Sequence, residues 1–284
     1  MSGATPGPPP DHLAGVAARL REELGLSFDG ALGPGFAAGV AAAALERGEP
    51  PEALAAAVCA GDRGARALLI EHVVVGETSF CRHPDQLALI GRLAASAPAP
   101  VRVWSAGCAS GEEAYSVAMA LAEAGRRPGE DLVLGTDVSA RALEVARAAA
   151  YGARALRFTP VHCADRWFGP PTADGARLVT PALAAGVRFA HHNLLTPEPP
   201  PGAPFDVVLC RNVLIYFEPA RIGEALARLA AALVPGGALV LGPVELPLAG
   251  GTPLLPIAEG AGFASAEDGG VAYLRKRADD GHRT

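Results

Sequence analysis

The sequence predicts an α/β protein in which a doubly wound parallel sheet follows an all-helical N-terminal domain. Two patterns support this prediction. Apolar, strand-like runs alternate with helical stretches from about residue 101 onward, whereas the first ninety residues show only helical spacing. Half of the residues are hydrophobic and 19% are charged, which is ordinary usage for a globular protein and excludes a largely disordered chain.

The N-terminal part begins with residues 1–10, which contain four prolines and two glycines and are expected to form a disordered leader. From Asp11 to about Gly25, apolar residues recur at helical spacing. Glycine, proline or aspartate bound each of three further helical stretches, at 34–47, 50–59 and 62–75. We therefore expect a helical domain over residues 11–95.

The second part begins with a strand over 101–106, a glycine-containing loop over 107–111 and a helix that continues to about residue 123. The same alternation predicts strands at 132–136, 205–210 and 238–242 and helices at 139–149 and 219–233. Residues 271–275 are expected to add an edge strand. This domain is predicted to span 96–276, with a tail over 277–284.

One interval interrupts the alternation. Between residues 151 and 192, the short apolar pieces 177–180 and 187–190 are separated by clusters of glycine and proline. Such a pattern suits short antiparallel strands better than a crossover helix. We therefore predict a small β subdomain inserted at about 152–192.

Charge and cysteine usage exclude several classes of protein. The net charge of −6 gives no basic face for binding DNA or RNA, so no nucleic-acid partner is expected. Neither a signal peptide nor a membrane-spanning stretch is visible, which predicts a cytoplasmic protein without direct membrane insertion. The five cysteines form no CxxC pair and have no histidine at the usual zinc-ligand spacing, so reduced thiols and no metal site are expected.

The glycine loop and a following acid indicate a nucleoside site. Gly107 and Gly111 follow the first strand, where small residues let the backbone approach a ligand. Asp137 follows the second strand, where a carboxylate can accept both hydroxyls of a ribose. Each feature also has a plain structural interpretation, because tight turns favour glycine and Asp137 could cap the next helix, a role that Ser139 can also fill.

Four stretches together resemble the chemotaxis receptor methyltransferases, the CheR-type protein-glutamate O-methyltransferases that use S-adenosylmethionine (SAM). The stretches are Gly76-Glu-Thr-Ser-Phe-Cys-Arg82, Val103-Trp-Ser-Ala-Gly-Cys-Ala-Ser-Gly-Glu-Glu-Ala-Tyr-Ser116, Thr136-Asp137 with 143–151, and Cys210-Arg-Asn-Val-Leu-Ile-Tyr-Phe217 with 233–239 and 242–245. The resemblance covers about residues 11–276. It implies a Rossmann-like SAM methyltransferase domain that carries a small antiparallel β insertion and follows a helical N-terminal domain.

The resemblance also implies the site residues. Arg82 and Tyr216 match residues that lie beside the transferred methyl group, and we expect them to be catalytic. The cofactor is expected to contact Gly76, Thr78, Arg82, Glu113, Asp137, Asn193, Leu194, Asn212 and Val213. On the sequence alone, the residue types favour structural roles: Asn193 and Asn212 as turn residues at strand ends, Arg82 as a surface salt-bridge residue and Tyr216 as a half-buried core aromatic.

The implied activity is methylation of glutamate side chains on chemoreceptors, with a receptor cytoplasmic domain or another signalling protein as partner and a monomeric enzyme. Two departures from the family pattern are Gly76 in place of asparagine and Cys81 in place of phenylalanine. The helix over 36–46 also lacks the basic residues with which the family approaches acidic receptors. The alternatives are a degenerate cofactor-binding scaffold and a methyltransferase with a non-receptor substrate.

Overall fold

The computed structural model describes residues 11–28, 32–245 and 254–278 of the 284-residue chain. The predicted leader over 1–10, and residues 279–284 of the predicted tail, lie outside the described residues. The chain divides into two compact units, whose ranges are Met1–Val75 with Tyr216–Glu218, and Gly76–Ile215 with Pro219–Thr284.

The first unit is helical, as the sequence predicts. Asp62 caps the start of α4, since its Oδ1 accepts hydrogen bonds from the backbone N–H of Gly64 (2.8 Å) and Ala65 (3.0 Å). Gly48, with a φ of 75°, caps the end of α2. The apolar faces of the helices meet in a core that includes Leu20, Leu54 and Leu69. The helices are α1 (Asp11–Leu24), α2 (Gly33–Arg47), α3 (Pro51–Cys59) and α4 (Arg63–Val73).

A short segment from the second half of the chain completes the first unit. Phe217 forms an antiparallel bridge with Leu26, and on either side of it the N–H of Ser27 donates to the Tyr216 carbonyl (2.7 Å) and the N–H of Glu218 donates to the Gly25 carbonyl (2.8 Å). These backbone bonds explain why the three residues of this segment group with the helices rather than with the sheet.

The first unit ends at Val75, earlier than the predicted domain boundary at residue 95. The next helix, α5 (Pro84–Ala95), belongs to the second unit because it packs on α6 (Glu112–Glu123). Leu89 and Ile90 of α5 are fully buried in the same core as Met119 of α6. Helical spacing alone does not reveal which partner an amphipathic helix will choose.

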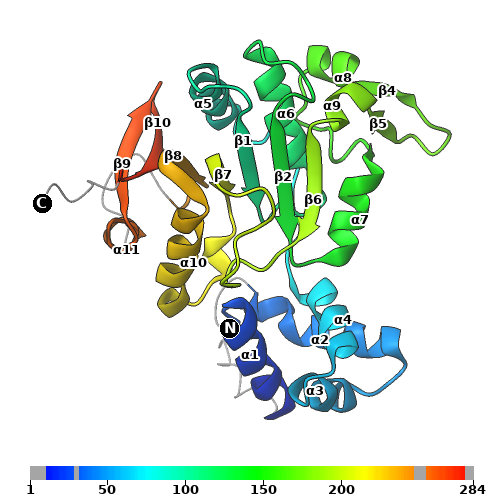
Figure 1. Ribbon diagram of the computed structural model, residues 1–284. Helices are drawn as coiled ribbons and strands as arrows, with labels where there is room; N and C mark the ends of the chain where they lie inside the picture. The colour runs from blue at the N-terminus through cyan, green and yellow to red at the C-terminus, as the bar shows by residue number, and fades with distance from the viewer. Residues whose placement is uncertain (1–10, 29–31, 246–253, 279–284) are drawn as a thin grey trace, which may run out of the picture. The chain divides into compact units, whose positions relative to one another are not determined.

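The second unit is built on a seven-stranded sheet in the order β6-β2-β1-β7-β8-β10-β9 (Figure 1). The first five strands are parallel, and β10 is antiparallel to both neighbours. The strands are β1 (Arg102–Ala106), β2 (Leu132–Asp137), β6 (Val187–His191), β7 (Phe205–Cys210), β8 (Leu233–Leu241), β9 (Phe263–Asp268) and β10 (Val271–Lys276). This confirms the predicted doubly wound α/β domain.

Helices connect and cover the strands. The α6 helix packs on β1, β2 and β6, α7 (Ala140–Ala148) packs on β2 and β6, and α10 (Pro219–Ala231) packs on β8. A further helix, α11 (Leu254–Gly260), packs on α10 and β9. The chain leaves β1 toward β2 on one side and reaches β7 on the other, so the strand order reverses between β1 and β7. In open α/β sheets, ligands bind at the carboxyl ends of the strands at such a reversal.

Three expectations about the last strands need correction. The helix predicted to reach 233 ends at Ala231, and the strand predicted for 238–242 already begins at Leu233. The strand predicted at 271–275 is not an edge strand, because the unpredicted β9 lies outside it. Gly269 and Gly270, both with positive φ, form the two-residue turn that joins β9 to β10 as a hairpin.

The predicted antiparallel insertion is present as a three-stranded sheet in the order β3-β5-β4. Its elements and the adjoining helices are β3 (Ala150–Tyr151), α8 (Val161–Trp167), β4 (Phe168–Pro171), β5 (Arg177–Val179) and α9 (Pro181–Ala184). The assignment of 187–190 to this subdomain is wrong, because these residues form β6 of the main sheet, parallel to β2. The Phe189 ring packs over Gly135 of β2, where a Cβ would lie 2.7 Å from the ring. The absence of a side chain at Gly135 therefore leaves room for the Phe189 ring of β6 beside β2.

None of the described helices is long and apolar enough to cross a membrane.

Candidate cofactor site and active site

The loop after β1 is held against the end of β2. The backbone N–H groups of Gly107 (2.8 Å) and Cys108 (2.9 Å) both donate to the Thr136 carbonyl. Gly107 and Gly111 have φ values of 75° and 93°, which glycine adopts without strain. A Cβ at Gly107 would lie 2.6 Å from Cγ2 of Val213, so this glycine lets the loop after β1 pack closely on the segment after β7.

Asp137 lies at the carboxyl end of β2, beside that loop. Its Oδ2 accepts a hydrogen bond from the N–H of Ala109 (2.9 Å), and its Oδ1 accepts one from the N–H of Ser139 (2.9 Å). The helix cap of α7 is Ser139, whose Oγ accepts from the N–H of Ala142 (2.9 Å). Ser139 therefore supplies the cap, and the Asp137 carboxylate stands at the end of β2, at the position where a ribose binds in sheets of this kind.

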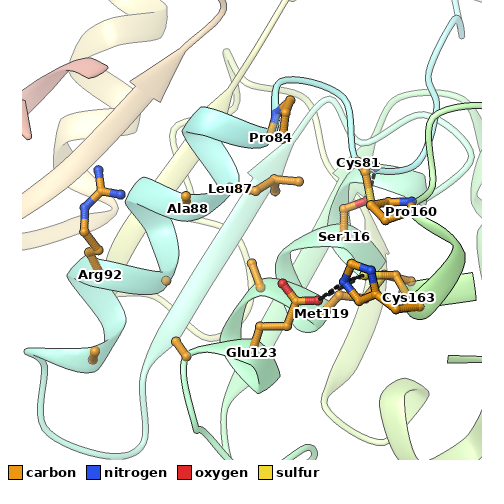
Figure 2. A pocket seen from close by; sticks show the side chains of 15 residues that line it. Cys81, Pro84, Leu87, Ala88, Arg92, Ser116, Met119, Glu123, Pro160 and Cys163 are labelled. Atoms are coloured by element: carbon orange, nitrogen blue, oxygen red, sulfur yellow. Dashed lines mark hydrogen bonds and ion pairs between the residues drawn. The ribbon is translucent and has the colours of Figure 1, made fainter. Parts of the chain in front are cut away.

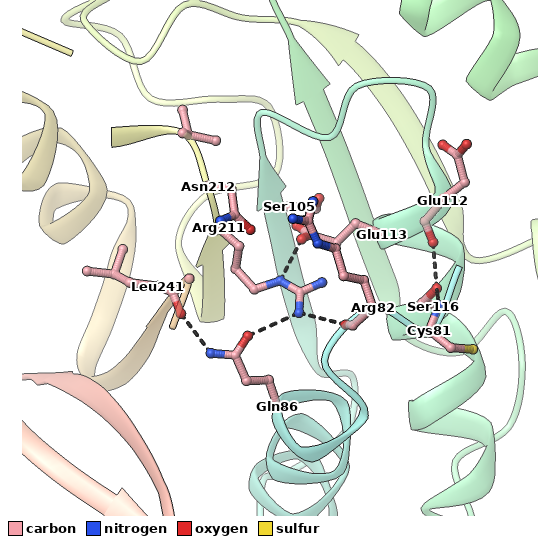
Figure 3. A network of polar contacts seen from close by, with 12 residues as sticks. Cys81, Arg82, Gln86, Ser105, Glu112, Glu113, Ser116, Arg211, Asn212 and Leu241 are labelled. Atoms are coloured by element: carbon pink, nitrogen blue, oxygen red, sulfur yellow. Dashed lines mark hydrogen bonds and ion pairs between the residues drawn. The ribbon is translucent and has the colours of Figure 1, made fainter. Parts of the chain in front are cut away.

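A buried ion pair joins α6 to the end of β7 (Figure 3). Nε of Arg211 donates to Oε2 of Glu113 (2.7 Å), and Oε1 of Glu113 accepts from Oγ of Ser105 on β1 (2.7 Å). Nη1 of Arg211 donates to Oε1 of Gln86 (3.1 Å), and Nε2 of Gln86 donates to the Leu241 carbonyl (2.7 Å). The network thus ties α5, β1, α6, β7 and β8 together beneath the strand ends.

Arg82 is attached to the same network through its backbone. Its carbonyl accepts a hydrogen bond from Nη1 of Arg211 (3.0 Å), whereas its half-buried side chain reaches the Glu77 carbonyl at 3.5 Å, the outer limit of a hydrogen bond. The neighbouring Phe80 is fully buried and packs edge-on against Tyr151 (4.8 Å) and Phe168 (5.0 Å). The main chain at Arg82 is fixed, and the guanidinium is held only weakly.

A second buried carboxylate shapes the segment after β7. Glu245 accepts hydrogen bonds from the backbone N–H groups of Asn212 (2.9 Å), Val213 (3.0 Å), Leu214 (2.8 Å) and Gly242 (2.7 Å). Burial raises the pKa of the Glu245 carboxyl, and these backbone donors act in the opposite direction. Asn212 has a φ of 58°, so the segment turns sharply at the point where the carboxylate binds it.

Asn193 and Leu194 lie shortly after the end of β6, separated from it by His192. The N–H of His192 donates to the Asp137 carbonyl (3.1 Å), which places this segment beside the end of β2. Oδ1 of Asn193 accepts from the N–H of Leu195 (3.0 Å), which is the turn role that its residue type favours, and Leu194 is buried.

Gly76 and Thr78 lie on the segment that leads to Arg82. Gly76 is exposed, and a Cβ there would meet nothing within 4 Å, so the absent asparagine side chain of the family pattern leaves open space. Between them, Glu77 pairs with Arg154 (2.8 Å) and Arg157 (3.1 Å) of the insertion. Thr78 is half-buried.

Tyr216 closes the 3₁₀ turn η1 (Leu214–Tyr216) and belongs to the first unit, whereas the other predicted site residues belong to the second. The contacts above link Arg82 to Glu113 through Arg211. The loop at Gly107 joins the end of β2, where Asp137 lies, to the segment with Asn212 and Val213. Sequence reasoning missed Gln86, Arg211 and Glu245 as parts of the site. For Arg211, the sequence did offer a signal, because a charged residue directly after an apolar strand, as in Cys210-Arg211, lies at the strand end where ligands bind.

The arrangement suits SAM. An acid stands after β2 where a ribose would bind, and a tightly packed glycine loop stands at the strand-order reversal. Two further carboxylates support the walls of this site: Glu113 fixes Arg211, and Glu245 fixes the backbone of the segment after β7. When bound, SAM supplies an electrophilic methyl group on a sulfonium.

Comparisons with known proteins agree with this geometry. Residues 76–248 match the family described as "CheR methyltransferase, SAM binding domain". The chain is 38% identical over 195 residues to the "Probable biofilm formation methyltransferase WspC" of Pseudomonas aeruginosa, which is 66% of this chain and 46% of that protein. It is 35% identical over 179 residues to the "Chemotaxis protein methyltransferase" of Escherichia coli K12, covering 62% of this chain and 63% of the relative.

The chain thus spans less than two thirds of either relative.

Among solved structures, an O-methyltransferase family protein from Burkholderia thailandensis is similar with a TM-score of 0.44 and 16% identity, over 80% of this chain and 62% of that chain. The family match alone covers more than half of the 284 residues. The chain therefore belongs to the CheR family of SAM-dependent methyltransferases, and residues 76–248 form its SAM-binding domain.

Proposed function

We propose that this chain transfers the methyl group of SAM to glutamate side chains of a chemosensory receptor and forms glutamate methyl esters. The observation that supports the proposal best is the state of Arg82, whose main chain is bonded to the Arg211–Glu113 pair while its guanidinium is weakly held. A planar, permanently charged guanidinium on a fixed backbone suits the binding of an incoming carboxylate.

The chemistry asks little of the protein beyond positioning. A glutamate side chain with an ordinary pKa near 4.3 is ionised at pH 7, so its oxygen attacks without a general base. The new carbon–oxygen bond forms as the carbon–sulfur bond breaks, and the negative and positive charges of the reactants cancel. Holding the two reactants in line is therefore the main contribution, which in oriented reactions reaches about 7–11 kcal/mol.

The proposal also assigns roles to the other predicted residues. Asp137 binds the ribose hydroxyls, and the segment with Asn212 and Val213 lines the adjacent part of the cofactor site. For Tyr216, the role rests on the resemblance of the motif over 210–217 to that of the family, which assigns its hydroxyl to orienting the accepting carboxylate or the methyl group. Glu113 acts mainly by neutralising Arg211, because both of its oxygens already accept hydrogen bonds from side chains.

Recruitment of the receptor does not rely on the charge of α2. The lone arginine of this helix, Arg47, pairs with Glu49 (3.2 Å) and Asp62 (2.8 Å), so its charge is locally neutralised. The names of the relatives include both a chemotaxis and a biofilm-formation methyltransferase. We therefore propose a receptor of a signalling pathway as substrate, without a strongly acidic docking surface for this helix.

The test is transfer of labelled methyl from SAM to the cytoplasmic fragment of a receptor from the same cell. The expected product is a base-labile ester on the receptor, absent when glutamate is replaced by glutamine at the modified positions. If the chain binds SAM in calorimetry but methylates none of the receptors of the cell, the proposal is wrong and a regulatory, non-catalytic role remains.

A further inference from the structure

A cluster of three metal-binding side chains lies outside the cofactor site. Sγ of Cys163 donates to Oε1 of Glu123 (3.0 Å) and lies 3.3 Å from Nε2 of His162, and this nitrogen lies 3.6 Å from the same carboxylate oxygen. Glu123 is the last residue of α6, and His162 and Cys163 are consecutive in the first turn of α8. Figure 2 shows the Glu123 carboxylate pointing toward Cys163 across the end of a pocket.

Two of the three ligand–ligand separations are close to those of a tetrahedral zinc site. Zinc binds sulfur at about 2.3 Å, imidazole nitrogen at about 2.0–2.1 Å and carboxylate oxygen at about 2.0–2.2 Å in a tetrahedron, which sets ligand–ligand distances of about 3.4–3.6 Å. The sulfur–nitrogen distance of 3.3 Å and the nitrogen–oxygen distance of 3.6 Å lie close to these values. The sulfur–oxygen distance of 3.0 Å is that of the present hydrogen bond and would have to lengthen by roughly half an ångström on metal binding. Small rotations of the three side chains would bring the sulfur, the nitrogen and the oxygen to bonding distance from a single ion.

The chemistry of the ligands selects the metal. Once the thiol has lost its proton, the thiolate and the carboxylate carry two negative charges, which balance one divalent cation. A thiolate with an imidazole favours zinc or a similar transition metal and disfavours magnesium and calcium, which prefer oxygen ligands.

The surroundings permit access. The side chains of His162 and Glu123 are 75% and 47% exposed, whereas Cys163 is buried, so an ion could enter from solvent and keep a water molecule as its fourth ligand. Behind the cluster, the pocket of about 490 Å³ has mainly apolar walls, which include Leu87 of α5 and Met119 of α6. An apolar shell strengthens the attraction between the ion and its charged ligands.

We propose that Glu123, His162 and Cys163 form a zinc site that fastens the β insertion to the sheet domain. The ligands join α6, which packs on the central strands, to α8, which leads directly into β4 of the insertion. Binding replaces the hydrogen bond of the thiol by a sulfur–zinc bond, and the thiol proton passes to solvent. The site uses ligands that are about 40 residues apart in the chain, which is why the spacing rules for zinc motifs do not reveal it.

The first experiment titrates the full, metal-free chain with Zn²⁺ in a calorimeter and with Co²⁺ in a spectrophotometer. One equivalent of each should bind, and Co²⁺ should show the sulfur-to-metal charge-transfer band of a thiolate ligand. Cys163→Ser, His162→Gln and Glu123→Gln should each weaken Zn²⁺ binding at least about tenfold, since even outer-shell changes cost metal sites about 10–100-fold. Two of these side chains are exposed, so their variants are expected to fold normally.

The matched controls are Cys59→Ser and His191→Gln, which remove an exposed thiol and an exposed imidazole elsewhere. Both should bind Zn²⁺ as the unchanged chain does, and Mg²⁺ should not bind at the site. Zn²⁺ should also raise the melting temperature of the unchanged chain but not that of Cys163→Ser. The proposal fails if the Co²⁺ complex lacks the charge-transfer band, or if the three ligand variants retain full affinity.

Discussion

Arg211 donates to Glu113 at 2.7 Å, and this ion pair joins residues 98 positions apart with side chains that are only 3% and 11% exposed. It fixes the end of β7 against the first turn of α6, the two elements that flank the strand-order reversal. The same guanidinium donates a hydrogen bond to the carbonyl of Arg82. The main chain of the proposed catalytic residue is therefore positioned by a buried arginine.

The first prediction concerns the stability of this pair. Arg211→Leu leaves the Glu113 carboxylate buried without its partner, and such a change should lower the free energy of unfolding by about 3–5 kcal/mol. Glu113→Leu combined with Arg211→Leu should recover part of that loss, because no unpaired charge remains. Urea unfolding of the two single variants and the double variant measures the coupling. Additive losses would show that the two side chains do not act as a pair.

The second prediction concerns Glu245, which binds four backbone N–H groups and thereby shapes the segment with Asn212 and Val213. Glu245→Gln replaces one accepting oxygen by an NH₂ group that faces N–H donors, so the segment should lose its conformation. We expect SAM affinity to fall by about 10- to 100-fold, equivalent to the loss of one or two charge-assisted hydrogen bonds. Calorimetric titration with SAM measures the change.

The matched control for Glu245 is Glu267→Gln, which makes the same chemical change on the exposed face of β9. Its SAM affinity should equal that of the unchanged chain. Equal affinities for both variants would mean that the segment after β7 keeps its shape without the carboxylate.

The third prediction concerns Arg82. Arg82→Ala should lower kcat for methyl transfer by about 10²–10³-fold, the usual cost of removing one electrostatic contact to the reacting groups. Arg82→Lys keeps the charge but not the planar fork, so it should recover only part of the rate. Release of labelled methyl from base-labile esters measures the rate, with Arg127→Ala, an exposed cation paired with Glu130, as control. A normal rate in Arg82→Ala would remove Arg82 from the mechanism.

The fourth prediction concerns the hydroxyl of Tyr216. Tyr216→Phe keeps the ring and removes only the hydroxyl, and the main-chain bond from Ser27 to the Tyr216 carbonyl does not involve the side chain. We expect kcat to fall about tenfold through poorer orientation of the reactants, while the Kd for SAM stays constant. Parallel measurement of kcat and Kd separates the two effects, and a change confined to Kd would assign Tyr216 to cofactor binding.

The fifth prediction concerns pH. Burial, together with the neighbouring His191, lowers the pKa of His192 from its ordinary value of 6.5, and its ring packs edge-on against Trp104 at 5.7 Å. Between the lowered pKa and 6.5, the unfolded chain binds more protons than the native protein does. The free energy of unfolding therefore rises with pH across this window and falls as the pH drops below 6.5.

His192→Gln should flatten that dependence, which urea unfolding at several pH values between about 5 and 7 measures. A residual slope of the same sign is expected from His83, whose pKa is also lowered, mainly by burial and by Arg211. An unchanged slope in His192→Gln would show that this histidine is protonated equally in both states.

Much of the second unit could be predicted because its signals are local. The run over 205–210 is bounded and apolar, and the strand predicted there is found with the same ends. The positions of the glycine loop and of Asp137 were also predictable, because each directly follows a short apolar run that the sequence identifies as a strand. The position of β6 was not predictable in this way, because a short apolar run fits an antiparallel hairpin and a parallel strand equally well until the space beside Gly135 is known.

By itself, the sequence determined the alternation of strands and helices, the helical first unit and the motifs that mark a SAM-binding domain. The tertiary structure decided which strands are neighbours and which distant charges meet, as in the pairs Glu113–Arg211 and Glu123–Cys163. The physical reason is the range of the interactions. Periodicity and capping act over a few residues, whereas the pairing of buried polar groups depends on sheet order and helix packing across the whole domain.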